Sequence, residues 1–430
     1  MIDDVMSLAS RAADQADAVV KTDSTTSLRF HDGVLQEADY SEATGANLRM
    51  VVDGRIGGAG TTTAEATALV EAAIASARVG DEQRLFYPEP APCADPQVHD
   101  AAAAEADLDD LELGGVLIGD QLADDRTTVD LHLERSVGSV HVASTRGVDQ
   151  YYEVTGVALD VTVTRTHGER PVTARAWWGG TGLLTDEDVA SIVHDLQQRL
   201  AWGEAAATIP DGPAVVCLTP RAVASVLVPL RRALRGTALH YGTSPLTDKI
   251  GTRIVDERIT LVDDPLLDGR PGSRPIDDEG VVCRRLPLIE AGFLRAGIYD
   301  LETAALSGVP ATGHGRRTTF GKPQAAFSNL EMLHGEDSWD LLLEATGDGL
   351  VVDGFHGIGR GLTGSGAVRA RASLAYRVSG GKIVGHTPDV RLSGNVFRSL
   401  ERVLALGNDR PWLGSVAVPA MVVEGFHVVS

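Results

Sequence analysis

Two acidic clusters in the second half of the chain have the residue types and spacing that could support chemistry. The aspartate pair Asp263-Asp264 and the acidic run Asp277–Glu279 both lie within Val262–Arg285, VDDPLLDGRPGSRPIDDEGVVCRR. Neighbouring carboxylates can act as general acid and base, or bind a hard cation. Aspartates beside proline and glycine are also typical turn and cap residues. We favour this structural role for both clusters.

Five arginines form a basic set in a chain whose net charge is −22. A guanidinium group can bind a peptide carboxylate or backbone carbonyls. It can equally pair with nearby aspartates, or with acidic residues of a partner subunit. We weigh ion pairing above ligand binding for this set, which consists of Arg274, Arg284, Arg285, Arg316 and Arg317.

The histidines and cysteines do not have the spacing of a metal site. None of the twelve histidines is followed four or five residues later by another, and no His-Glu dipeptide occurs. Cys93, Cys217 and Cys283 lie far apart and form no CxxC pair. A catalytic zinc needs about three protein ligands. We therefore expect no metal, no cofactor and no catalytic residue in this chain.

One glycine motif resembles a nucleotide-binding loop. Gly359–Gly364, GRGLTG, fits GxGxxG, but it precedes the alternating segment Val368–Val378 and does not open a helix after a strand. Glycines in a hairpin loop explain it better. No GxSxG elbow or Walker lysine loop occurs either, so serine-hydrolase chemistry has no support.

Composition limits the class of protein and its partners. The 430 residues are 43% hydrophobic and 23% charged, and no run approaches the roughly 20 apolar residues of a membrane span. The net charge of −22 repels phosphate backbones, so we expect no direct nucleic-acid binding. The first residues, MIDDVMSLAS, lack the basic and apolar regions of a secretory signal. We expect a cytoplasmic protein with no membrane association.

The elements that must position these residues begin with a mixed pattern. Helical spacing over Asp4–Lys21 is followed by alternating segments that turn at Asp32-Gly33 and again at Asp53-Gly54. We therefore predict a helix and then two antiparallel hairpins. Further predicted helices and strands follow in the first half, at Thr63–Arg78, Leu108–Asp124, Thr128–Glu134, Ser139–Ala143, Thr155–Thr164 and Asp186–Ala206.

A domain boundary is predicted at the turn-rich segment Thr208–Pro213. The second half contains one helix, Pro220–Leu234, and otherwise mostly alternating strand patterns. We expect an α+β protein with two domains. Residues 1–208 would form an antiparallel sheet with helices, and residues 209–430 a mostly antiparallel barrel-like or sandwich domain.

Several sequence blocks in the right order resemble the TldD/PmbA family, once described as modulators of DNA gyrase. Besides Val262–Arg285, they include FHDGVLQEADYSEATG, VDGRIGGAGTT, SPLTDKIG, ATGHGRR, FSNLEML and LSGNVFRSLERVLALGND. The resemblance covers nearly the whole chain. It implies one of two paralogous subunits, of which one is a metallopeptidase and the other lacks the metal site.

The predicted helix after the domain boundary indicates which subunit this chain resembles. In the catalytic subunit of the family this helix carries HExxxH, and a later cysteine supplies a further ligand. Here it reads PRAVASVLVPLRRALRG, and the late segment Gly407–Pro419 has no cysteine. The resemblance therefore implies a TldE/PmbA-type, non-catalytic subunit. Zinc would be held by a TldD-like HExxxH paralogue in a heterodimer or larger heteromer that cleaves unfolded or extended peptides.

The resemblance also suggests where such a peptide would bind. His240 and Tyr241 follow the degenerate helix where the family's active cleft would begin, and Arg316-Arg317 lie in a glycine-rich context. We predict that an extended peptide is added as a strand near these four residues. The alternative is a peptide-binding or maturation module for one particular peptide or peptide-like natural product.

Overall fold

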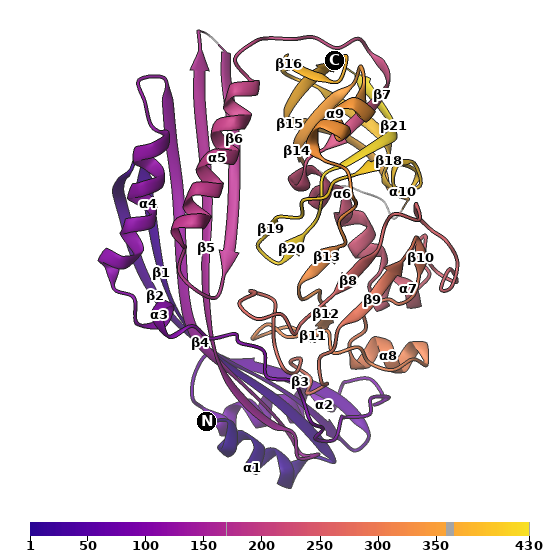
Figure 1. Ribbon diagram of the computed structural model, residues 1–430. Coiled ribbons are helices and arrows are strands. Elements are labelled where there is room, and N and C mark those ends of the chain that lie inside the picture. The colour runs from indigo at the N-terminus through magenta and orange to yellow at the C-terminus, as the bar shows by residue number, and fades with distance from the viewer. Residues whose placement is uncertain (169, 358–364, 430) are drawn as a thin grey trace.

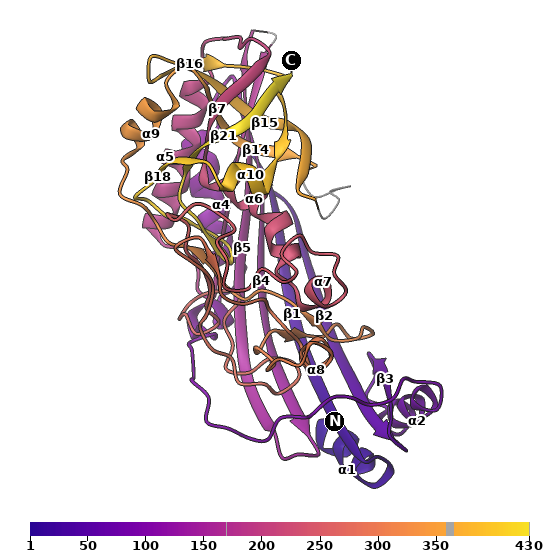
Figure 2. The ribbon, with the colours of Figure 1, turned by 90° about the vertical axis from the view of Figure 1, so that its right-hand side faces the viewer.

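A long twisted sheet from the first half of the chain lies beside a β-rich part from the second half in the computed structural model (Figures 1 and 2). The structure describes residues 1–168, 170–357 and 365–429, so the predicted glycine loop 359–364 lies outside the described residues. The expected α+β class is confirmed. In the described part of the chain, no helix has both the length and the apolar composition needed to cross a membrane.

The N-terminal sheet contains six antiparallel strands in the order β3-β2-β1-β4-β5-β6. Its first two hairpins turn where the sequence predicts, because Asp32-Gly33 and Asp53-Gly54 all have positive φ, as tight hairpin turns require. The predicted strands Thr128–Glu134 and Ser139–Ala143 are parts of one longer strand. The strands are β1 (Gln15–His31), β2 (Val34–Val52), β3 (Arg55–Thr61), β4 (Thr127–Ser144), β5 (Asp149–His167) and β6 (Arg170–Gly180).

Five helices belong to the described residues of this half. The capping box between Thr185 and Asp188 starts the last of them. The first predicted helix is too long, because the chain enters β1 at Gln15 instead of continuing helically to Lys21. The helices are α1 (Ile2–Ala12), α2 (Ala66–Ala77), α3 (Ala101–Glu105), α4 (Leu108–Leu122) and α5 (Asp186–Trp202).

The C-terminal part contains a closed barrel of five strands. The strand order β14-β7-β21-β17-β15 closes because β15 also pairs with β14. Strands β16 and β18 extend this sheet outside the ring. The strands are β7 (Gly212–Leu218), β14 (Leu350–His356), β15 (Ala367–Ser379), β16 (Lys382–His386), β17 (Arg391–Asn395), β18 (Val403–Leu406) and β21 (Met421–Val429).

A second sheet and five helices complete the C-terminal part, as far as the structure describes it. The sheet has the order β10-β9-β8-β13-β20-β19, and β11 and β12 form a separate short ribbon. These strands are β8 (Leu261–Asp263), β9 (Leu286–Glu290), β10 (Phe293–Leu294), β11 (Gly315–Arg316), β12 (Gln324–Ala325), β13 (Leu330–Met332), β19 (Trp412–Leu413) and β20 (Val416–Ala417). The helices are α6 (Pro220–Ala233), α7 (Gly236–His240), α8 (Leu301–Ser307), α9 (Trp339–Thr346) and α10 (Val396–Leu400).

The two halves share one hydrophobic core. Leu196 and Leu200 of α5 belong to the same buried cluster as Val351, Tyr376 and Val422 of the barrel sheet. The Tyr376 hydroxyl also donates to the backbone carbonyl of Arg199 at 2.7 Å. The sheet and the barrel are therefore packed together through apolar side chains.

A buried ionic group reinforces this contact. The Asp353 carboxylate of β14 accepts from Arg199 of α5 at 2.9 Å and from Arg221 of α6 at 2.8 Å. The two arginines also contact Asp195 of α5. Because Asp353 and Arg199 are almost fully buried, this network fixes the position of α5 relative to the barrel.

Candidate functional site

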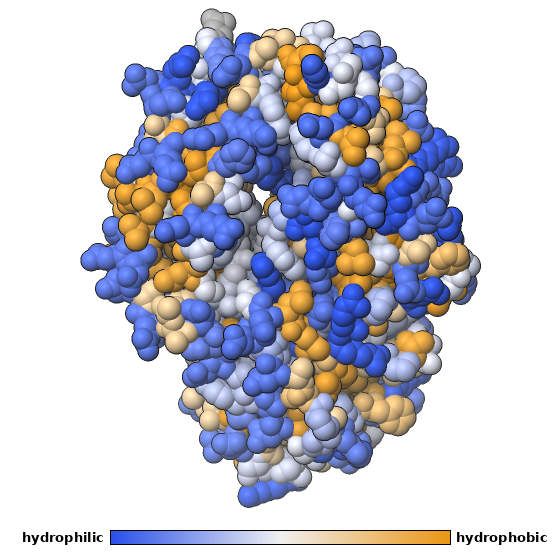
Figure 3. All heavy atoms as spheres, viewed as in Figure 1, coloured by the Kyte–Doolittle hydropathy of each residue, from blue (hydrophilic) through white to orange (hydrophobic). Residues whose placement is uncertain are grey.

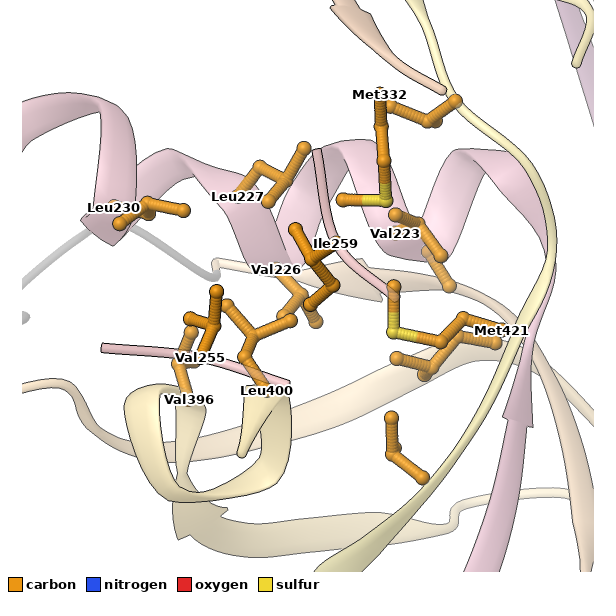
Figure 4. Close-up of a cluster of buried hydrophobic side chains, with 14 of the residues drawn as sticks. Val223, Val226, Leu227, Leu230, Val255, Ile259, Met332, Val396, Leu400 and Met421 are labelled. Carbon is orange, nitrogen blue, oxygen red and sulfur yellow. The ribbon is translucent and has the colours of Figure 1, made fainter. Parts of the chain in front are cut away.

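Helix α6 lies where the resemblance places the metal-binding helix of the catalytic subunit. One face of α6 is apolar and buried, and Pro229 stands inside the helix. Figure 4 shows Val223, Val226, Leu227 and Leu230 of α6 directed into a cluster that includes Ile259 and the two methionines Met332 and Met421.

The side chains on this helix cannot hold a zinc ion. Zinc binds thiolate, imidazole or carboxylate groups, and residues 220–233 include none of these. Among the residues that the structure describes, no group of three histidine, cysteine, aspartate or glutamate side chains is arranged to hold a metal. The donor set of the described residues therefore does not fit the zinc that the family implies.

The pair Asp263-Asp264 has the structural role that the sequence suggested. Asp263 accepts from the backbone N–H of Ser328 and lies 3.0 Å from Nε2 of His314, where both side chains are fully buried. Asp264 accepts from the backbone N–H of Leu266 at 3.0 Å, two residues later. These carboxylates stabilise loop conformation around β8.

The acidic run Asp277–Glu279 is buried between the two halves of the chain. Asp277 accepts from the N–H groups of Glu279, Val281 and Gly315, at distances of 2.8–2.9 Å. Glu279 accepts from the N–H of Leu301 at 2.8 Å, at the start of α8. The run therefore organises its own turn and joins it to the β11 and α8 segments.

Charged residues of the N-terminal sheet complete this group. Arg49 of β2 donates to Glu279 at 2.7 Å and to Asp17 of β1 at 2.8 and 2.9 Å. Lys21 of β1 donates to Asp278 at 2.6 Å. We call this set of charges, together with Asp277 and Arg317, the interdomain ionic cluster; Lys21 is 31% exposed and the other members are buried.

Burial controls protonation in the cluster. It raises the pKa of Asp277 to about 6. It also raises the pKa of Glu279 to about 7, where the Asp277 carboxylate adds to the shift and Arg49 opposes it. Burial would raise the pKa of Asp278 too, but Arg316 and Lys21 outweigh it, so this pKa lies below its ordinary value.

Arg317, predicted to bind substrate, lies inside the interdomain ionic cluster. Its side chain is fully buried, and NH2 forms an ion pair with Asp17. Its Nε has no hydrogen-bond partner among the described residues. Burial lowers the pKa of Arg317 to about 9. A peptide could reach this guanidinium only if the two halves separated locally.

The other three predicted substrate-binding residues are more accessible. Arg316 is 42% exposed and lies 3.5 Å from Asp278. His240 and Tyr241 at the end of α7 meet edge to face, with ring centroids 4.8 Å apart, and Tyr241 is 64% exposed. His240 also lies 3.3 Å from the hydroxyl of Ser307 in α8. Substrate contact at these residues stays a prediction.

A cavity of about 680 Å³ adjoins the ionic cluster. Tyr241 lines it together with residues 320–323, the loop that follows Arg316-Arg317. The side-chain amide of Asn47 in β2 holds this loop, because it lies 3.1–3.3 Å from the carbonyls of Thr318, Thr319 and Gly321. The fold thus brings Tyr241 and the loop after the arginine pair to one cavity.

Sequence reasoning missed the N-terminal contributors to this region, Asp17, Lys21, Asn47 and Arg49. A signal for two of them was present. Asp17 and Arg49 stand beside short apolar stretches, AVV after Asp17 and MVV after Arg49, at positions where a charge is buried only if it is paired. The identity of their C-terminal partners, Glu279 and Arg317, which lie 230 and 300 residues away, had no local signal.

Comparison with known proteins matches both halves of the chain to one family. Residues 211–430 match the PmbA/TldA metallopeptidase C-terminal domain, and residues 16–77 match PmbA/TldA metallopeptidase domain 1. A metalloprotease of Methanothermobacter thermautotrophicus is 28% identical over 92% of this chain and 88% of its own length. Metalloprotease MJ0996 of Methanocaldococcus jannaschii is 34% identical, over 39% of this chain and 37% of its own length.

Two solved structures have the same fold. TldE from Thermococcus kodakarensis superimposes with a TM-score of 0.89 over all of both chains, at 21% identity. A Thermotoga maritima protein described as a modulator of a DNA gyrase gives the same TM-score and identity, and the match covers 100% of this chain and 99% of that one. With more than half of its length matched to the family's C-terminal domain, this chain belongs to the PmbA/TldD metallopeptidase family.

Proposed function

We propose that this chain is the non-catalytic, TldE/PmbA-type subunit of a heteromeric TldD/TldE-type metallopeptidase that cleaves unfolded or extended peptides. The observation that carries the proposal is helix α6. Its buried face is filled by Val223, Val226, Leu227 and Leu230, and the helix has no zinc-binding side chain. A TldD-like paralogue with HExxxH would supply the zinc.

The two buried ionic groups support a structural role for this subunit. One joins α5 to the barrel through Asp353, and the other joins β1 and β2 to the acidic run through Arg49. A chain held rigidly at both places can present a fixed surface to a partner. Figure 3 shows a hollow between the two halves of this chain. In the complex, this subunit would form part of the wall around the peptide.

The cytoplasm is the compartment that we propose, with no membrane association. The strongly acidic composition, net charge −22, supports the absence of direct nucleic-acid binding. The mostly hydrophilic face in Figure 3 is consistent with a peptide-processing protein that works in water.

Co-expression tests the proposal. This chain is produced with an affinity-tagged HExxxH paralogue from the same genome, and an unrelated tagged protein of similar charge serves as the control. We expect a stable stoichiometric complex by size-exclusion chromatography with light scattering. Cleavage of a disordered protein such as casein should require both chains and zinc. Full-rate cleavage by the paralogue alone would refute the dependence on this subunit.

The alternative function is a peptide-binding or maturation module that acts without a protease. The cavity beside Tyr241 favours it, since a peptide could bind there without any metal. The two functions differ in the co-expression experiment. A module of this kind would bind peptide but would not co-purify with the paralogue.

A further inference from the structure

The cavity beside Tyr241 is formed by both halves of the chain, and no residue of α6 lines it. On one side lie β3 and α2, and on the other lie α7, α8 and the β11–β12 loop (Figures 1 and 2). Its volume of about 680 Å³ is within the range of known ligand sites, roughly 300–1,000 Å³. It is therefore separate from the region where the family's metal would bind.

Large apolar side chains are exposed on the walls of this cavity. Val79 is 87% exposed, Phe320 is 73% exposed and Tyr241 is 64% exposed. Only two phenylalanines in the described part of the chain are exposed to this degree, and the second, Phe86, directly follows the lining residue Leu85. Apolar surface gathered around one cavity indicates a binding site, whereas scattered exposed residues do not.

Gly58 keeps the cavity open. It lies on β3 and lines the cavity, and a Cβ atom built there would meet only the Leu48 carbonyl oxygen, at 3.5 Å. Its neighbour Gly60 differs, because a Cβ there would collide with the Thr319 carbonyl. Packing therefore requires glycine at position 60 but not at position 58. A side chain at position 58 would project into the free space.

The hydrogen bonds of β3 limit how a ligand can be held. Although β3 is an edge strand, the N–H of Ile56 donates to the Asp81 carbonyl at 3.0 Å and the N–H of Gly58 donates to Ser76 at 3.2 Å. These donors are not free to pair with an added strand. Strand addition through these two donors is therefore closed to a ligand, which leaves its side chains a larger part in recognition.

The charges around the cavity balance one another. Among the described residues, three cations and three anions line it: Arg49, Arg84 and Lys322, and Asp81, Glu82 and Glu302. A site with both signs of charge complements neither a polyanion nor a strongly cationic ligand. It suits a ligand with a neutral apolar group and a polar, uncharged backbone.

From these features we infer that the cavity binds a large apolar side chain, aromatic or long aliphatic, of an extended peptide. The peptide backbone lies along the charged rim and the side chain packs between Tyr241, Phe320 and Val79. The inference rests on the proposed function in that peptides are the ligands. It adds a second anchoring point, away from α6, that selects peptides by one apolar residue.

Fluorescence polarisation with two labelled peptides tests the inference on the isolated chain. One probe is a neutral, capped hexapeptide of glycine and serine with one central phenylalanine, and the other has serine in place of phenylalanine. We expect the phenylalanine probe to bind at least ten-fold more tightly. Equal binding of both probes, or no binding of either at millimolar protein, would overturn the inference.

Variants locate the binding. Gly58→Val should weaken binding of the phenylalanine probe at least ten-fold while the Tm stays equal or rises, because valine suits a strand. Tyr241→Ala and Phe320→Ala should also weaken it. Tyr151→Ala is the matched control, since Tyr151 is 54% exposed on β5 and does not line the cavity. Unchanged binding by Gly58→Val would place the peptide elsewhere.

Failure of the inference can be distinguished from failure of the proposed function. Binding is measured without the partner, whereas subunit function is judged by co-purification of the wild-type chain with the paralogue. Co-purification without selective peptide binding would overturn only the cavity site. Selective binding without co-purification would leave the cavity site and favour a peptide-binding module.

Discussion

Arg49 on β2 and Glu279 in the acidic run form a buried ion pair, with 2.7 Å between NH1 and Oε1. The two residues are 230 positions apart in the chain, and their side chains are 7% and 0% exposed. Because Arg49 also holds Asp17 on the neighbouring strand, one guanidinium joins the N-terminal sheet to the C-terminal part.

Replacing Arg49 with methionine should destabilise the protein strongly. The change leaves the Glu279 carboxylate buried without its cation and leaves Asp17 paired with Arg317 alone, and breaking such a buried pair costs about 3–5 kcal/mol. The free energy of unfolding from urea titration measures the effect. Arg29→Met is the control, because Arg29 is 63% exposed beside Glu37 and should change stability by no more than about 1 kcal/mol. Equal effects of the two variants would contradict a stabilising role for the cluster.

Stability should decrease between about pH 5 and pH 7 because of Glu279. Its pKa in the folded protein is raised to about 7, so in this range the folded state binds more protons than the unfolded state. The free energy of unfolding then falls as pH rises, by up to about 1.4 kcal/mol per pH unit. Glu279→Gln removes one of the two titrating groups, so its fall should be smaller, with the remainder due to Asp277, whose pKa is raised to about 6. Parallel curves for wild type and variant in this range would argue against the raised pKa.

The two adjacent arginines should behave differently. Arg317→Ala removes a fully buried cation next to Asp17 and should lower stability by about 3 kcal/mol or more. Arg316→Ala removes a 42% exposed side chain, so folding and complex assembly should persist. If Arg316 contacts substrate, this variant should reduce the rate of peptide cleavage by the assembled complex. Thermal unfolding and a cleavage assay on both single variants separate the structural role from the substrate role.

The purified chain should contain much less than one zinc per molecule. Helix α6 has no side chain that binds zinc, and Pro229 removes a backbone N–H from its interior. Elemental analysis after dialysis measures the zinc content, with the HExxxH paralogue as the positive control. One tightly bound zinc per chain would refute the assignment as the metal-free subunit.

Local sequence was sufficient to predict the hairpins of the N-terminal sheet. Asp-Gly pairs flanked by alternating apolar residues favour tight turns, and both pairs have the positive φ angles of such turns. The alternation of apolar and polar residues, by contrast, is lost where a strand is buried on both faces. Ala16 and Ala18 face one layer while Asp17 and Val19 face the other, so four buried residues in succession hide the strand period. Helical spacing then extended the first predicted helix to Lys21.

The candidate site was less predictable from the sequence. The absence of zinc-binding residues from α6 is a local property, and the sequence was enough to recognise it. The position of Arg317 is not local, because its burial depends on Asp17, 300 residues earlier. The cavity depends in the same way on Gly58 and Phe320, which only the completed fold brings together.

The shared hydrophobic core has a consequence for synthesis on the ribosome. The cluster that covers α5 includes Val422, so the N-terminal sheet cannot bury this surface until almost the whole chain has been made. At 5–20 residues per second, about 220 further residues after Leu200 take roughly 10–45 seconds. During that interval the part of this apolar surface that the barrel later covers remains open to aggregation or to chaperones. Truncation before the last strand should therefore leave an N-terminal fragment that chaperones retain.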